Sequence, residues 1–133
     1  MHLVLCVDER DGLSFCGRRL SRDSKVISCI RELTAGCSLW MSPYSANLFN
    51  HTDVKVDENF QKLAGDGDYC FLETTPLLTH YDNLESVILF CWNRSYPSTV
   101  RFPRTLLDGM KLADTRDFPG SSHERITMER YIL

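Results

Sequence analysis

The sequence lacks long hydrophobic runs and any large excess of charge of one sign. Its first apolar segment, Leu3 to Val7, is stopped by the polar residues 8–10, so it is too short for a signal-peptide core or a membrane-spanning helix. Lys and Arg number 15 and Asp and Glu number 18, and the formal net charge of −3 gives no indication of nucleic-acid binding. We therefore expect a cytoplasmic protein that binds neither a membrane nor nucleic acid.

Metal-ligand motifs are also missing, although the chain has six cysteines and four histidines. No Cys-x-x-Cys pair occurs and no two histidines stand at i and i+4, so we expect no metal site. In a reducing compartment the cysteines stay thiols. A metallo-nuclease of the ribonuclease Z kind needs a His-x-His-x-Asp-His cluster, which isolated histidines cannot build, and that function is excluded.

The length and composition are those of an ordinary globular domain. A chain of 133 residues with 43% hydrophobic and 25% charged residues can bury one core. Neither repeats nor low-complexity tracts occur. We predict a single domain over residues 1–133.

Hydrophobic periodicity predicts helices and strands in alternation. The clearest helix covers residues 24–35, with Asp23 directly before it and Gly36 directly after its last turn. Residues 11–17 are predicted to be a loop. Shorter helices are expected over 43–49, 57–64 and 76–81. Strands are expected over 2–7, 38–41, 53–56, 69–73, 85–92, 110–118 and 123–133.

Strands alternate with short helices early in the chain and follow one another at its end. This order predicts an α/β fold in a single domain, with a mixed, mostly parallel sheet and short flanking helices. The last two strands are expected to form an antiparallel pair at the C-terminus.

Several short motifs occur in a fixed order along the chain. They are Leu3-Val-Leu-Cys-Val-Asp-Glu-Arg-Asp-Gly-Leu, Leu20-Ser-Arg-Asp23, Leu39-Trp-Met-Ser-Pro-Tyr-Ser45, Tyr69-Cys-Phe-Leu-Glu-Thr and Ser98-Thr-Val-Arg-Phe-Pro. In this order the chain resembles a shortened, divergent dihydrofolate reductase, and also the reductase domain of riboflavin synthesis. The resemblance implies their fold, and it implies that Asp23 is the carboxylate that binds the pterin.

The chain departs from that family where the cofactor would bind. Glu73 and Thr74 stand where the resemblance places two glycines, which let main-chain amides approach a pyrophosphate. Pro43 replaces the arginine of the phosphate-binding motif, so a bidentate donor is lost. We therefore expect no cofactor, with NADPH left as the alternative.

Basic residues gather at the start of the clearest helix. Arg18, Arg19 and Arg22 flank a helix N-terminus, where peptide dipoles and free N–H groups favour anions. The alternative is that these side chains are merely solvated. Asp23 is either a catalytic or ligand-binding carboxylate or an acid that stabilises the first helical turn.

Other candidate ligand-binding residues lie at the ends of predicted strands. Trp92 and Arg94 suit stacking on a planar ring and binding its polar edge, or else they cap the core. Tyr44 and Ser45 open a short helix, where Ser45 is also explained as an N-cap. Glu73 and Thr74 complete the candidate set.

His123 and Glu124 are neighbours within the last predicted strand. Adjacent residues of a strand point to opposite faces, so we expect no acid–base pair there.

These observations lead to one main hypothesis and two alternatives. The main hypothesis is a reductase-like scaffold that binds a small anionic or nucleotide-like ligand without redox chemistry. The first alternative is an NADPH-dependent reductase of a pterin- or flavin-like substrate. The second is a protein-interaction module, a homodimer or a partner of a larger complex, with Trp40, Trp92 and Tyr96 as anchors.

Overall fold

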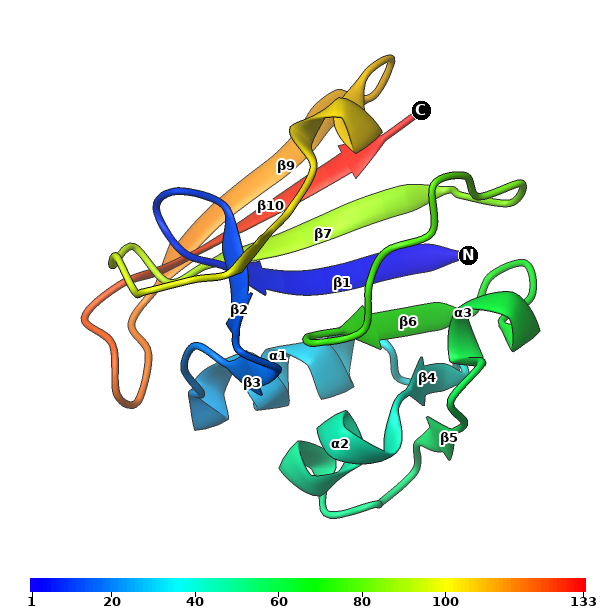
Figure 1. Ribbon diagram of the computed structural model, residues 1–133, viewed down its shortest axis with the longest axis horizontal. Coiled ribbons are helices and arrows are strands. Elements are labelled where there is room, and N and C mark those ends of the chain that lie inside the picture. The colour runs from blue at the N-terminus through cyan, green and yellow to red at the C-terminus, as the bar shows by residue number, and fades with distance from the viewer.

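The computed structural model describes residues 1–133 as two β-sheets with short helices around them (Figure 1). The elements are β1 (His2–Val7), β2 (Gly12–Phe15), β3 (Arg18–Arg19), α1 (Ser24–Leu33), β4 (Leu39–Met41), α2 (Pro43–Ala46), the 3-10 helix η1 (Asn47–Phe49), β5 (Lys55–Val56), α3 (Phe60–Leu63), β6 (Tyr69–Leu72), β7 (Ser86–Cys91), β8 (Val100–Arg101), the 3-10 helix η2 (Arg104–Leu107), β9 (Lys111–Phe118) and β10 (Ile126–Ile132).

The larger sheet has seven strands in the order β5-β4-β6-β1-β7-β10-β9. The first five strands are parallel to one another, and β10 and β9 add an antiparallel pair at one edge. The three-stranded sheet β3-β2-β8 is antiparallel, and β2 crosses the carboxyl end of β1 (Figure 1). The predicted fold class, a mixed and mostly parallel sheet with an antiparallel C-terminal pair, is confirmed.

The two faces of the large sheet carry separate clusters of buried side chains because successive residues of a strand point to opposite faces. On one face, Val4, Ile88 and Phe90 pack with Val26 and Ile30 of α1. The apolar residues of α1 recur at helical spacing and so form one stripe along the helix. This stripe packs on that face of the sheet and covers it.

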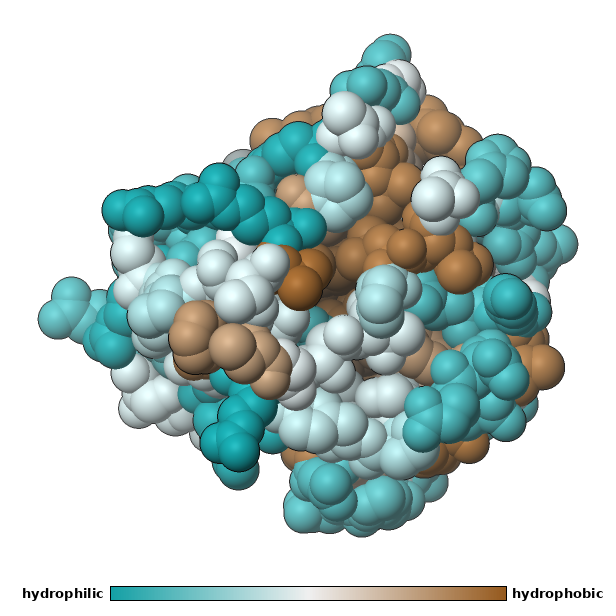
Figure 2. Space-filling model, in the orientation of Figure 1, coloured by the Kyte–Doolittle hydropathy of each residue, from teal (hydrophilic) through white to brown (hydrophobic).

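The opposite face has no long helix over it. Leu5 and Leu89 of the sheet pack there with Leu13 of β2, Phe60 of α3 and Phe102. The segments 73–85 and 102–110 complete the cover with partly buried apolar side chains, and apolar residues gather on this side of the molecule (Figure 2). The connection between β6 and β7 on this face is an irregular segment without a helix.

Two predicted segments have a different secondary structure from the one expected, and the last strand begins later than expected, at Ile126. The predicted helix over 76–81 is wrong: this segment is irregular, and Gln61 Nε2 donates to the carbonyl of Pro76 at 2.9 Å. The segment 11–17, predicted as a loop, contains β2, which turns into β3 at Cys16 and Gly17, both with positive φ. A two-residue turn of this kind matches the twist of the two strands of a hairpin. Gly17, which suggested a loop, therefore closes a hairpin.

The carboxyl ends of β1, β6 and β7 point to the same edge of the sheet. The β2–β3 hairpin, the β7–β8 segment and the β9–β10 loop gather there (Figure 1). In open α/β sheets ligands bind beyond this edge, and the candidate residues lie around it. None of the helices has the combination of length and apolarity that crossing a bilayer requires.

Candidate functional site

Asp23 is the N-cap of α1 and is buried. Its backbone is extended and its Oδ1 accepts the N–H of Lys25 at 2.9 Å, so the carboxylate satisfies a donor that the first helical turn leaves free. This is the structural role that the sequence allowed for an acid at this position.

The same carboxylate also holds the β9–β10 loop. The N–H and hydroxyl of Ser121 donate to Oδ1, and those of Ser122 donate to Oδ2, at 2.9 to 3.1 Å. His123 Nδ1 donates to Oδ2 at 2.9 Å. Burial alone would raise the pKa of Asp23, but these donors and the N–H of Lys25 hold that pKa well below the usual carboxyl range. Asp23 is therefore an anion with both oxygens already engaged.

His123 stands between Asp23 and two hydroxyl groups. Its Nε2 lies 3.0 Å from the Oγ of Ser21 and 3.0 Å from the hydroxyl of Tyr96. The indole of Trp92 stacks on the imidazole, with ring centroids 4.6 Å apart and planes 22° apart. The ring is thus fixed in orientation by Asp23 on one side and by Trp92 over its face.

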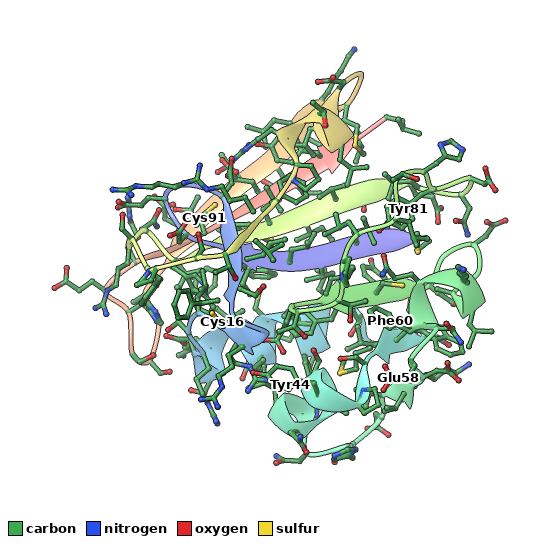
Figure 3. The ribbon with its side chains drawn as sticks, viewed as in Figure 1. Cys16, Tyr44, Glu58, Phe60, Tyr81 and Cys91 are labelled. Carbon is green, nitrogen blue, oxygen red and sulfur yellow. The ribbon has the colours of Figure 1, made fainter.

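Glu73 and Arg19 form a second polar cluster at the end of β6. The Nε and Nη2 of Arg19 donate to the two oxygens of Glu73 at 2.9 and 3.0 Å, and the side chain of Glu73 is 7% exposed. The hydroxyl of Ser45 donates to Glu73 at 2.8 Å. The ring of Tyr44, which projects from α2 (Figure 3), lies 4.4 Å below the guanidinium, and its hydroxyl accepts the N–H of Arg19.

This second cluster brings together four of the candidate ligand-binding residues. The charge of Glu73 is balanced by Arg19, so the place where a diphosphate would approach the end of β6 is filled by a closed network. A dinucleotide seated there would have to displace Arg19 and leave Glu73 buried without a partner, which is energetically costly.

A cleft of about 580 Å³ lies between the start of α1, the η1 region and the β9–β10 loop. Its wall is mainly polar, with hydroxyl, amide and guanidinium groups from Arg22, Ser24, Ser28, Asn47, Asn50 and Ser121. Asp23 also lines the cleft but has its oxygens engaged, so Arg22 is the side chain that brings free charge to it.

Of the remaining candidate residues, Arg18, Thr74 and Arg94 lie apart from these clusters, whereas Trp92 belongs to the first one. Arg18 is exposed on β3, and Thr74 is half-buried just after β6. Trp92 is buried, whereas Arg94 is exposed beside a smaller hollow that it shares with Glu124.

The aromatic residues suggested as interaction anchors are engaged within the fold. Trp92 stacks on His123, and Tyr96 bonds to it. Trp40 donates its indole N–H to Asp68 at 3.1 Å.

His123 is the residue that sequence reasoning misjudged. It was expected inside the last strand, but β10 begins at Ile126 and His123 lies in the preceding loop. The run Pro119-Gly120-Ser-Ser carries turn chemistry and could have shown that the strand starts later. Without the strand, the argument from opposite faces no longer applies, and the imidazole turns inward to Asp23.

No three His, Cys, Asp or Glu side chains converge in the way that a metal ion would require.

Comparison with known proteins identifies the fold. No family model and no curated protein matches the chain. Among solved structures, a dihydrofolate reductase from Enterococcus faecalis complexed with NADP(H) and RAB-propyl superposes with a TM-score of 0.62, over 98% of this chain and 94% of its own. The sequence identity is 8%, so the likeness shows a dihydrofolate-reductase-like fold and no more than the fold.

Proposed function

We propose that this chain binds a small anionic or nucleotide-like ligand, without redox chemistry, in the cleft between α1 and η1. The observation that carries the proposal is the composition of that cleft: hydroxyl and amide groups and the cationic Arg22 line about 580 Å³, while Asp23 is saturated by its own donors. Concave sites with a few converging polar groups are the usual places for small ligands.

Arg22 and the amino end of α1 bring positive potential to the cleft, and the carboxylate of Asp23, held by its own donors, offsets part of it. The cleft lies at the amino end of α1, where the helix dipole is positive. The main-chain N–H groups of Arg22 and Asp23 donate to no other protein atom, so they add free donors near the same end. A phosphate or carboxylate in the cleft would meet the guanidinium and the hydroxyls together.

Thermal-shift measurements with nucleotides, pterins and flavins test this proposal. We expect an anionic compound to raise the melting temperature, and Arg22→Gln to remove most of that rise. Arg18→Gln is the matched control. Arg18 is an exposed arginine of the β2–β3 hairpin, close to Arg22 in the sequence, and it lines none of the larger clefts. If no anionic compound shifts the melting temperature, or if both variants behave alike, ligand binding in this cleft is ruled out.

A second candidate, an NADPH-dependent reductase, is favoured by the fold itself, since the likeness to dihydrofolate reductase extends over 98% of the chain. The Arg19–Glu73 network argues against it. Titration with NADPH, followed by nucleotide fluorescence, separates the two candidates. Binding in the micromolar range would restore the reductase, and its absence together with binding of another anion would support the first proposal.

A further inference from the structure

Ser21, His123 and Asp23 form a continuous hydrogen-bonded chain at the carboxyl edge of the sheet. The Oγ of Ser21 lies 3.0 Å from Nε2 of His123, and Nδ1 of His123 lies 2.9 Å from Oδ2 of Asp23. Ser21 and Asp23 precede and open α1, while His123 comes from the β9–β10 loop, about 100 residues later. This arrangement has the geometry of a nucleophile, a base and a carboxylate that orients the base.

The protonation pattern of the imidazole follows from its partners. Asp23 is an anion and can only accept, so Nδ1 carries a proton, and in the neutral imidazole the lone pair then lies at Nε2. Both His123 and Asp23 are shielded from solvent, with 2% and 0% of their side chains exposed. The stacked indole of Trp92 prevents the ring from turning away. Nε2 is therefore a base aimed at hydroxyl groups.

Two hydroxyls reach that base at the same distance, that of Ser21 and that of Tyr96. Tyr96 lies 3.0 Å from Nε2 and 3.4 Å from the Oγ of Ser21. A single lone pair on Nε2 accepts one proton, so when Ser21 donates to His123, the phenol can donate to Ser21 Oγ. That donor would stabilise the negative charge that develops on Ser21 when it loses its proton.

Ser21 is the accessible member of the chain. It is half-buried, whereas the other two residues are buried. The main-chain N–H of Arg22, directly after Ser21, makes no hydrogen bond within the protein. The residue after a nucleophilic serine commonly supplies such a donor to the oxyanion of an acyl-transfer reaction.

From this geometry we infer that Ser21 is a nucleophile for small carboxylic esters, with His123 as its general base and Asp23 as the residue that positions His123. The inference goes beyond ligand binding in the α1–η1 cleft and can fail or succeed independently of it.

The reaction requires only ester and water. Ser21 Oγ attacks the carbonyl carbon as its proton moves to Nε2 of His123; the bond to the alcohol oxygen then breaks, and the alcohol leaves with that proton. Water next attacks the acyl–Ser21 ester and gives a proton to Nε2. The acyl–Oγ bond breaks, Ser21 regains the proton, and a carboxylic acid leaves.

Labelling with a fluorophosphonate, located by mass spectrometry, and hydrolysis of p-nitrophenyl acetate test the inference in the full chain. We expect the label on Ser21 and loss of both signals in Ser21→Ala. Ser95→Ala is the control, because Ser95 is an exposed serine that bonds to Glu9 away from this chain of residues. No label at residue 21, or equal labelling of Ser95, overturns the proposal.

The role of His123 is tested by His123→Gln. If a cooperative melting transition shows that this variant still folds, it should acylate about 100-fold more slowly or slower still. If His123→Gln does not fold, Ser21→Cys is tested in its place. The thiol at residue 21 would be activated by the same base, His123. Alkylation by iodoacetamide should then be faster at residue 21 than at the exposed Cys16. Slower alkylation at residue 21, or hydrolysis unaffected by His123→Gln, would show that His123 is not its base.

Discussion

At the scale of single residues, Asp23 accounts for the local structure of the site. One carboxylate caps α1, binds the main chain of Ser121 and Ser122, and sets the proton position on His123. A buried charge is stable only when donors surround it, and the six donors here supply that environment. Removing the charge would weaken the attachment of the loop to the helix.

Asp23→Asn should therefore lower the free energy of unfolding by roughly 3 kcal/mol at pH 7, because buried donors lose their anionic partner. The pKa of Asp23 is depressed in the folded state, so its stabilisation is present above the unfolded-state pKa of about 4 and is lost as pH falls from about 5 toward 2. Urea unfolding across this range should show a weaker pH dependence in the variant. Asp82→Asn, at a side chain 94% exposed, should leave the wild-type profile unchanged.

Gly120 is the second residue on which the loop depends. A Cβ at this position would lie 2.5 Å from Oδ2 of Asp23 and 2.9 Å from the carbonyl oxygen of His123. Because one contact belongs to the buried helix cap and the other to the loop that this cap holds, Gly120→Ala should cost roughly 1 to 3 kcal/mol in unfolding free energy. Gly65→Ala is a matched control, since its nearest atom is 3.8 Å away. Equal melting temperatures for the two variants would contradict this account of the loop.

At the scale of elements, polar side chains connect pieces that the sheets leave unpaired. Arg31, in the last turn of α1, donates to the carbonyls of Phe49 and Thr52 and so fixes α1 to the segment around η1. Arg19 and Glu73 similarly connect β3 to the end of β6, and Ser45 adds α2. These side-chain bonds thus join α1 to the η1 segment and β3 to β6 and α2.

The Arg19–Glu73 pair offers an energetic test of this element-scale connection. Arg19→Met alone should destabilise the protein by roughly 3 kcal/mol, because Glu73 stays buried without its partner. The double variant Arg19→Met/Glu73→Gln should recover much of that loss, which urea unfolding would measure. The half-exposed pair Arg104–Asp11 provides the comparison, and Arg104→Gln should cost no more than about 1 kcal/mol. A double variant as unstable as Arg19→Met would exclude uncompensated burial of Glu73 as the cause.

At the scale of the whole molecule, a single sheet separates two cores with different covers. One core lies under α1, and the other lies under extended segments and one-turn helices. The absence of a long helix on the second face does not leave it open, because Leu5, Leu72 and Leu89 are at most 1% exposed there. The cysteine thiols that pack in the two cores are shielded from solvent to different degrees.

Thiol reactivity reports on this burial across the whole fold. Cys16 and Cys37 are exposed, whereas burial raises the pKa of Cys70 and of Cys91 to about 12 and raises that of Cys6 well above its usual value. At pH 8 the native protein should thus react rapidly with a disulfide reagent at Cys16 and Cys37, and slowly at Cys6, Cys70 and Cys91 until urea unfolds it. Mass spectrometry of the modified sites would detect the reverse order, which would contradict the packing described.

The sequence by itself determined the elements whose signal is local. The strand at His2–Val7, the helix over Ser24–Leu33 and the strand at Ser86–Cys91 follow from apolar spacing, capping and turn residues, which act over a few neighbours. Their order was enough to predict a parallel sheet with an antiparallel edge.

Only the tertiary structure decided which side chains meet. Arg19 reaches Glu73 across 54 residues and Asp23 reaches His123 across 100, and such pairs depend on strand order and loop paths that no local periodicity encodes. Apolar spacing at 76–81 likewise fitted a helix, yet Leu77 and Tyr81 are partly buried by packing on the core without helical hydrogen bonds. The same pattern of apolar residues can be buried in more than one backbone conformation. The contacts that the segment makes with the sheet therefore decide which conformation forms.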